Sequence, residues 1–448
     1  MWDIRDYFNG LLGAVFRTSN QREAAGQRLA RSAPPCYDAS FVEGSPMQSL
    51  FTFRVHGESS AEAGAIRVAL VIQEYQRGGA EQQAALIARS LAERLGACDV
   101  ITTRTDVEGT AGVRLRRLGA RHKHGFWRLH NLLATFTYFA LYGHRYSVVH
   151  GFCLSSLVLG ALLGGRLRGC RTVLRVCTIG DGGDIAKIKA RRFGRLVWSL
   201  FLRADVFTAF TPGMVSELCR EGIPPARIAL QVGAVSACDS TALTNEARAE
   251  ARAAIGLAER PTVLCIGRWV AQKRIDVILE AWRLLGPTHA TLVLVGDGPE
   301  RTRITAWYEH SGCAGSVRIL GWHPHPEMLY RAADILVFVA RDEAFGNVVA
   351  EAMAHGLAPI TTRTGLASHL IGDDVNGILI DDDAPDQVAH ALRQLIDDPE
   401  RRRRLGYAAW QTARESFDPA VVVDELVALY RQLVDHGRLP AELERHVA

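Results

Sequence analysis

The chain has 448 residues, more than a single typical hydrophobic core supports, so its length predicts two domains. Hydrophobic residues make up 48% of it, which excludes a disordered polymer, and a net charge of +4 is too small to indicate a nucleic-acid-binding protein. The nine cysteines form no Cys-x-x-Cys pair, which argues against a zinc site or a disulfide framework. Cys177 and Cys265 lie in apolar runs and are interpreted as buried thiols.

Residues 1–64 differ from the rest of the chain. Ser-Ala-Pro-Pro and Gly-Glu-Ser-Ser segments are typical of loosely ordered polypeptide, and the apolar residues from Trp2 to Phe16 fall on one helical stripe. This segment is predicted to be an N-terminal extension that is poorly ordered or amphipathic. Charged residues interrupt its start, and no apolar run reaches the roughly 18–20 residues that cross a bilayer. We therefore expect a cytoplasmic protein, with peripheral contact at the inner face of the cell membrane as an open alternative.

Strand-like and helix-like segments alternate from residue 65 to residue 235. A strand at Ile66–Ile72 is followed by the pair Gly78-Gly79 and a helix to about Leu95. Further strands are predicted at 99–103, 147–150, 172–177, 206–210 and 228–232. This alternation predicts a parallel sheet and a first doubly wound, Rossmann-like domain. The aromatic helix from Phe126 to Tyr142 is interpreted as core, with an exposed binding surface as the alternative.

Residues 236–260 are rich in alanine and charge and are predicted to connect two domains. A second series of strands is predicted at 262–267, 290–296, 316–320, 334–339, 358–361 and 378–380. It predicts a second doubly wound domain over 261–415, and the chain is therefore of the α/β class. A final helix is predicted within 416–448.

Two glutamates eight positions apart, Glu343 and Glu351, mark a junction between a strand and a helix. The run Ala333–Val339 is typical of a buried strand, and a helix is predicted from Val348 with Asn347 as its N-cap. Glu343 would then lie at the carboxyl end of the strand, where ligands bind in open α/β sheets, and Glu351 on the first turns of the helix. Carboxylates beside free helix N–H groups suit the hydroxyls and the phosphate of a sugar or nucleotide.

The pattern resembles the Glu-x7-Glu motif of retaining GT-B glycosyltransferases of the family-4 type, also called glycosyl transferases group 1. Four further segments resemble motifs of the same family in the same order: Gly78-Gly79-Ala80-Glu81, Gly267-Arg268 through Gln272-Lys273, Gly296-Asp297-Gly298-Pro299, and Leu320-Gly321 through Ala333-Asp334. The resemblance covers about Ile66 to Tyr430. It implies the GT-B fold, with two Rossmann-like domains facing a central cleft and the helix of 416–448 crossing back to the first domain. The domain of 65–235 would hold the acceptor, and the domain of 261–415 would bind the nucleotide sugar. The exposed alternative for the aromatic helix would then be a surface for a lipid-linked acceptor.

The resemblance also implies an activity. The expected enzyme is a retaining hexosyl-type glycosyltransferase that uses a UDP- or GDP-sugar and a lipid-linked or saccharide acceptor, in bacterial surface polysaccharide or glycolipid biosynthesis. Arg268 and Lys273 would stabilise the leaving diphosphate without a metal, and Glu343 would hold hydroxyls of the donor sugar; these three are the expected catalytic residues. The expected donor-binding residues, with Glu351 at the ribose, are Gly78, Gly79, Gly267, Gly296, Asp297, Phe345, Gly346, Asn347, Val348 and Glu351. No cofactor and no nucleic-acid partner are expected.

The acceptor side departs from the family pattern. Relatives usually carry a histidine just after the strand at 172–177, where this chain continues from Cys177 to Asp184 without one. The acceptor-side candidates are His150, Asp181 and Asp184. Two alternatives stay open: a catalytically degenerate partner subunit that binds nucleotide sugar, which the missing histidine favours, and a nucleotide-sugar 2-epimerase, whose relatives lack this glutamate spacing.

Overall fold

The structure is a computed structural model that describes residues 66–75, 79–105, 111–119, 126–178, 180, 182–323 and 326–437. The predicted amphipathic stripe between Trp2 and Phe16 lies outside these residues, as do the site candidates Gly78 and Asp181. In the described ranges, no helix is both long and apolar enough to cross a bilayer.

The first sheet has seven parallel strands in the order β5-β3-β1-β6-β7-β8-β9. The strands are β1 (Val68–Ile72), β3 (Cys98–Thr102), β5 (Val113–Arg117), β6 (Val148–Phe152), β7 (Arg171–Arg175), β8 (Val206–Ala209) and β9 (Ile228–Leu230). In β1, Leu70 lies between Val100 of β3 and His150 of β6. The strand order reverses between β1 and β6, and ligands bind outside the carboxyl ends of strands at such a reversal.

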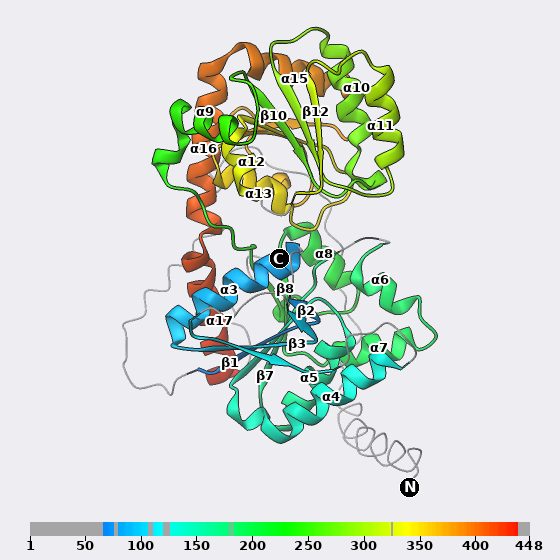
Figure 1. Ribbon diagram of the computed structural model, residues 1–448. Coiled ribbons are helices and arrows are strands. Elements are labelled where there is room, and N and C mark those ends of the chain that lie inside the picture. The colour runs from blue at the N-terminus through cyan, green and yellow to red at the C-terminus, as the bar shows by residue number, and fades with distance from the viewer. Residues whose placement is uncertain are drawn as a thin grey trace. The chain divides into compact units, whose positions relative to one another are not determined.

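Helices cover both faces of this sheet (Figure 1). They are α3 (Gly79–Leu95), α4 (Trp127–Tyr142), α5 (Ser156–Leu167), α6 (Asp184–Lys189), α7 (Gly194–Phe201) and α8 (Pro212–Arg220). Helices α4 and α5 pack so closely that a Cβ atom at Gly160 would lie 2.2 Å from the carbonyl oxygen of Leu132. Beside the main sheet, β2 (Glu74–Tyr75) pairs with β4 (Arg104–Thr105).

The second sheet has six parallel strands in the order β12-β11-β10-β13-β14-β15. They are β10 (Thr262–Ile266), β11 (Thr291–Val295), β12 (Val317–Gly321), β13 (Ile335–Phe338), β14 (Ala358–Thr362) and β15 (Ile378–Ile380). The strand order reverses between β10 and β13, which meet at Leu264 and Leu336. The helices are α9 (Asn245–Ala254), α10 (Ile275–Leu285), α11 (Arg301–His310), α12 (Glu327–Ala332), α13 (Asn347–Ala354), α14 (Ala367–Leu370), α15 (Pro385–Asp397), α16 (Pro399–Phe417) and α17 (Pro419–His436).

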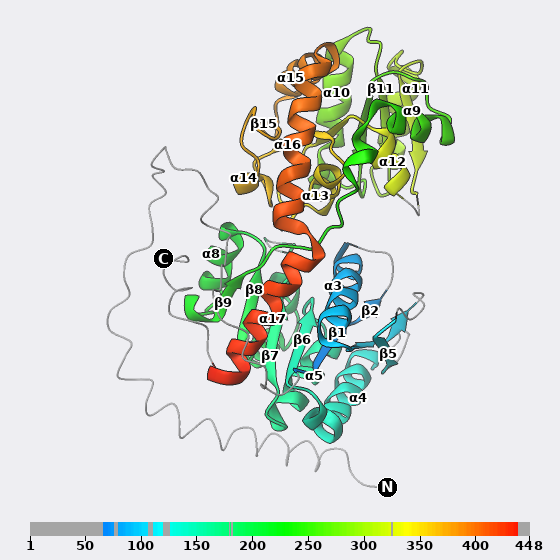
Figure 2. The same ribbon diagram turned by 90° about the vertical axis from the view of Figure 1, so that its left-hand side faces the viewer.

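The predicted fold class is confirmed, because both sheets are parallel and doubly wound. The arginine-rich edge strand β5 was missed: its sequence Val-Arg-Leu-Arg-Arg leaves its residues half-buried or exposed and carries no buried-strand signal. Helix α17 packs against α3 and β7 (Figure 2). Arg94 of α3 pairs with Asp424 of α17 at 2.8 Å. The domain boundaries stay predictions.

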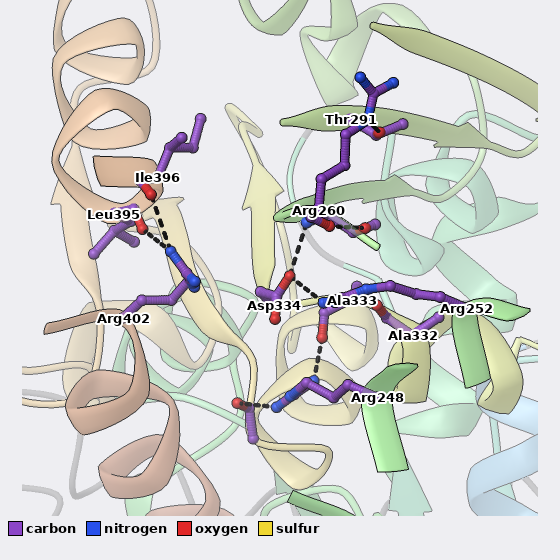
Figure 3. Close-up of polar contacts among 12 residues, drawn as sticks. Arg248, Arg252, Arg260, Thr291, Ala332, Ala333, Asp334, Leu395, Ile396 and Arg402 are labelled. Atoms are coloured by element: carbon purple, nitrogen blue, oxygen red, sulfur yellow. Dashed lines mark hydrogen bonds and ion pairs between the residues drawn. The ribbon is translucent and has the colours of Figure 1, made fainter. Parts of the chain in front are cut away.

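The predicted connection of 236–260 contains a helix, α9, which packs on α12. Figure 3 shows two of its arginines pointing at the chain between α12 and β13. Arg252 Nε donates to the carbonyl oxygen of Ala332 at 2.9 Å, and its guanidinium pairs with Asp334. Arg248 donates to the carbonyl oxygen of Gly356 at 2.8 Å and to that of Ala333. These buried contacts attach α9 to the second sheet and its helices.

Candidate functional site

Two glycine loops meet at the carboxyl ends of β10 and β11. Gly267 and Gly296 have φ of 147° and 142°, and a Cβ atom at Gly296 would lie 1.9 Å from the carbonyl oxygen of Gly267. The loops are bonded to each other, since the N–H of Trp269 donates to the carbonyl oxygen of Asp297 at 2.9 Å. Only glycine fits at Gly296, because any side chain would force the loops apart.

Asp297, expected near the donor, uses its carboxylate within its own loop. Oδ1 accepts the N–H of Gly298 at 2.8 Å, and Oδ2 pairs with Arg301 at 3.1 Å. These contacts connect the loop to the first turn of α11. A donor contact by Asp297 stays a prediction.

The structure brings two of the three expected catalytic residues into contact. Lys273 lies in the turn after β10 and Glu343 in the loop after β13, and their side chains form an ion pair. Lys273 Nζ also lies 4.4 Å from the ring centroid of Phe338. Both charged side chains are about one-fifth exposed, at 20% and 21%, so an anionic ligand can still reach the ammonium group. Arg268 is exposed in the same loop as Lys273.

Helix α13 begins one residue earlier than predicted. Gly346 is its N-cap with φ of 92°, and Asn347 is its first helical residue, so the prediction of Asn347 as N-cap is wrong. A left-handed residue is needed to turn the chain into the helix, and glycine adopts it without steric cost. The first N–H group of the helix that donates a hydrogen bond to the preceding backbone is that of Val349, which donates to the carbonyl oxygen of Gly346 at 2.9 Å. The N–H groups of Asn347 and Val348 precede it and suit an anion.

The ring of Phe345 is buried rather than presented to a ligand. It packs against Phe210 and Phe417, with ring centroids 5.2 and 5.7 Å away. Its carbonyl oxygen accepts the N–H of Leu366 at 2.7 Å. The ring therefore stabilises the loop between Glu343 and α13, and a donor contact stays a prediction for its backbone.

Gly79 and Asn347, both expected near the donor, are neighbours. A Cβ atom at Gly79 would lie 2.5 Å from Nδ2 of Asn347. Gln83, which the sequence analysis missed, donates to Oδ1 of Asn347 at 3.2 Å and to the carbonyl oxygen of Ala234 at 2.8 Å. Glycine at position 79 therefore allows the start of α3 to approach the start of α13.

Glu351 lies on α13 with its carboxylate beside Tyr330, another residue that the sequence analysis missed. The hydroxyl of Tyr330 donates to Oε2 of Glu351 at 2.5 Å, and its ring stacks on His355. Burial raises the pKa of Glu351 to about 7, and the hydrogen bond from Tyr330 opposes this shift. The carboxyl group thus titrates near neutral pH.

This shift predicts a pH-dependent stability. The folded state holds the proton of Glu351 more tightly than the unfolded chain, so the stabilisation is present below about pH 4.5 and is lost as the pH rises through 7. Glu351→Gln cannot ionise, and we expect it to be more stable than the parent by about 1–3 kcal/mol at pH 8 and by less at pH 5. Thermal unfolding at the two pH values measures this. Glu425→Gln tests the same effect at a second position and should show the same trend, because burial raises the pKa of Glu425 to about 7 as well. A stability difference between Glu351→Gln and the parent that is the same at pH 5 and pH 8 would contradict the prediction.

On the acceptor side, His150 is fully buried in β6. Its Nδ1 lies 2.6 Å from the hydroxyl of Tyr430 on α17, and burial lowers its pKa well below the usual value. This placement favours a structural role over contact with an acceptor. Asp184 closes the loop after β7, where its carboxylate accepts the N–H of Cys177 at 3.0 Å and the hydroxyl of Thr178 at 2.8 Å.

Comparison with known proteins supplies the family context. The model of the family "Glycosyl transferases group 1" matches residues 247–412, and that of the "Glycosyl transferase 4-like domain" matches residues 78–231. A D-inositol 3-phosphate glycosyltransferase of Corynebacterium diphtheriae is 28% identical, covering 86% of this chain and 93% of that protein. The lipopolysaccharide core biosynthesis glycosyltransferase LpsE of Rhizobium meliloti is 29% identical, over 38% of this chain and 50% of its own length. This chain spans about half the length of several of the relatives that it matches, LpsE among them.

Solved structures share the fold. HepE of Anabaena, crystallised with UDP and glucose, superposes with a TM-score of 0.67 at 17% identity, covering 82% of this chain and all of HepE. At this identity the likeness establishes the fold alone.

Proposed function

Because this chain belongs to the group 1 glycosyltransferases with the GT-B fold, we propose that it transfers a hexosyl-type sugar from a nucleoside diphosphate donor to an acceptor hydroxyl, with retention of the anomeric configuration. The observation that carries the proposal is the convergence of Lys273, Glu343 and the first N–H groups of α13 at the carboxyl ends of β10 and β13. A cation and helix N–H groups suit a diphosphate, and a carboxylate suits sugar hydroxyls.

In the proposed mechanism the donor diphosphate binds Arg268, Lys273 and the N–H groups of Asn347 and Val348. As the glycosidic bond breaks, negative charge grows on the diphosphate, and these fixed donors stabilise it. Glu343, aligned by its ion pair with Lys273, accepts hydrogen bonds from the donor sugar. The acceptor attacks from the face that the diphosphate leaves, and a donor phosphate oxygen takes its proton. This route retains the configuration and, in the proposal, needs no metal.

The nucleotide is proposed to place its ribose at Glu351. The carboxylate lies on the second turn of α13, behind the N–H groups proposed for the diphosphate. Ribose hydroxyls would donate to this carboxylate and favour its ionised form. HepE was crystallised with UDP-glucose, so UDP-sugars are the first donors to test and GDP-sugars the second.

The acceptor is proposed to be a saccharide or a lipid-linked saccharide of a bacterial surface polysaccharide or glycolipid, used at the inner face of the cell membrane. Helices α4 and α7 both pack on α5 and carry exposed apolar side chains. Phe126, just before α4, is 83% exposed, and Phe193, just before α7, is 65% exposed. Both segments also carry basic side chains, Arg128 on α4 and Arg191 just before α7. Exposed apolar and basic side chains together suit an anionic lipid surface.

The proposed function is tested with the purified full chain, UDP- and GDP-sugars and saccharide or lipid-linked acceptors. We expect a glycosylated product whose anomeric configuration, read by NMR, equals that of the donor, with the same rate in excess chelator. Inversion, or loss of the rate on chelation, would overturn the proposed mechanism. Nucleotide binding without transfer or hydrolysis would indicate the degenerate partner subunit, and an epimerised nucleotide sugar would indicate the 2-epimerase.

A further inference from the structure

Two cysteines meet at the carboxyl edge of the first sheet. Cys153 directly follows β6 and Cys177 lies two residues beyond β7, and these neighbouring strands are paired up to Phe152 and Arg175. The N–H of Cys153 donates to the carbonyl oxygen of Arg175 at 3.1 Å. The two Sγ atoms are 2.8 Å apart, with the thiol of Cys153 donating to Cys177. Cys153 has φ of 59°, a conformation that side-chain-bearing residues rarely adopt.

Both thiols are partly exposed, as are Cys219, Cys238 and Cys313, whereas Cys98, Cys170 and Cys265 are buried. The interpretation of a buried thiol is therefore confirmed for Cys265 and wrong for Cys177, because β7 ends at Arg175 and leaves Cys177 in a loop. The pair lies next to the strand reversal between β1 and β6, where ligands bind in open α/β sheets. Its contact with Cys177 and burial are the main causes that raise the pKa of Cys153, and the carboxylates of Asp184 and Glu81 raise it further.

A metal ion explains this arrangement less well than sulfur chemistry does. Asp184 is the third residue within reach of both thiols, but its carboxylate already accepts the N–H groups of Cys177 and Thr178 and the hydroxyl of Thr178. Two thiolates on one tetrahedral zinc ion would stand about 3.8 Å apart, since each Zn–S bond is about 2.3 Å. The observed Sγ separation of 2.8 Å is much shorter.

We propose that Cys153 and Cys177 are an oxidative modification site. A small-molecule disulfide such as glutathione disulfide converts the two thiols into a reversible intramolecular disulfide. This disulfide lowers the rate of transfer to the acceptor. Cys177, which lies in the loop after β7, attacks glutathione disulfide as a thiolate and releases one glutathione. Cys153 then gives up its proton and attacks the Cys177 sulfur, and the second glutathione leaves. Two protein thiols are oxidised, and one glutathione disulfide is reduced to two glutathiones. Disulfides in a reducing compartment are usually transient and regulatory, in agreement with this role.

The chemical test treats the full chain with glutathione disulfide, alkylates the remaining thiols and maps the peptides by mass spectrometry. We expect a cross-linked peptide pair containing Cys153 and Cys177, and its loss after reduction by dithiothreitol. In Cys153→Ser we expect a glutathione adduct that stays on Cys177. Cys219, a partly exposed thiol on α8, is the internal control and should react on the order of tenfold more slowly. Modification of Cys219 before this pair, or a stable adduct on Cys177 of the parent, would overturn the proposal. Zinc that stays bound and blocks alkylation of both thiols would overturn it in favour of a metal site.

The functional test rests on the proposed transferase activity. We expect oxidation to lower transfer to the acceptor by about tenfold or more, with affinity for nucleoside diphosphate unchanged and activity restored by dithiothreitol. Cys177→Ser should bind nucleotide as the parent does and should keep its transfer rate in glutathione disulfide. Transfer that persists although mass spectrometry finds the disulfide would overturn the effect on the acceptor. A protein that forms the disulfide but transfers no sugar under any condition would refute the proposed function and leave the modification site standing.

Discussion

Lys273→Ala is expected to lower the turnover number by about a hundredfold or more, the scale of losing one preorganised charge contact to a transition state. Lys273 is the partly buried cation at the carboxyl end of β10, and its ion pair with Glu343 positions it without a ligand. Arg268→Ala is expected to have an effect of the same size, since Arg268 shares the loop. Steady-state kinetics with the donor identified by screening measures both variants. Near-parental turnover in both would remove their diphosphate role.

The matched control is Arg283→Ala on α10. Arg283 pairs with Glu280 on the surface, with side chains 54% and 42% exposed, and such pairs contribute little. Its turnover should equal that of the parent, which separates the loss of a site charge from the loss of any positive charge in the same domain. Because Lys273 and Glu343 touch, the effects of Lys273→Ala and Glu343→Gln should not add. Strict additivity would show that the two residues act separately.

Arg252→Ala is expected to lower the free energy of unfolding of the second domain by about 3–5 kcal/mol, the cost of breaking one partner of a buried ion pair. Arg252 and Asp334 have side chains only 10% and 11% exposed, and Asp334 also accepts the N–H of Thr262 at 2.7 Å. Removing the guanidinium leaves a buried carboxylate without its cation. Urea unfolding followed by tryptophan fluorescence measures the loss, because Trp269 and Trp282 are buried in this domain.

Arg89→Ala serves as the control for this loss. Arg89 pairs with Glu93 on α3, and both side chains are 64% exposed, so the change should be within about 0.5 kcal/mol. A similarly small loss for Arg252→Ala would show that α9 is not essential to the second domain. That result would support the prediction of 236–260 as a simple connection.

The sequence by itself determined the α/β class, the two parallel sheets and the order of the motifs. Buried parallel strands such as β10 and β13 are continuous apolar runs, and helices such as α10 repeat apolar residues at helical spacing. Both are local patterns, so they can be recognised without knowing the fold. The edge strand β5 was missed for the same reason, because its arginines give it no such local pattern.

Only the tertiary structure decided which side chains meet. Lys273 and Glu343 are 70 positions apart and Cys153 and Cys177 are 24 apart, yet each pair is in contact because its members follow strands of one sheet. Likewise, Tyr330 reaches Glu351 from a different helix. Such contacts depend on strand order and register, which arise from the packing of the whole sheet rather than from neighbouring residues. The same packing buried His150, a residue kept as an acceptor-side candidate, and left Cys177 partly exposed, although its apolar local sequence indicated a core position.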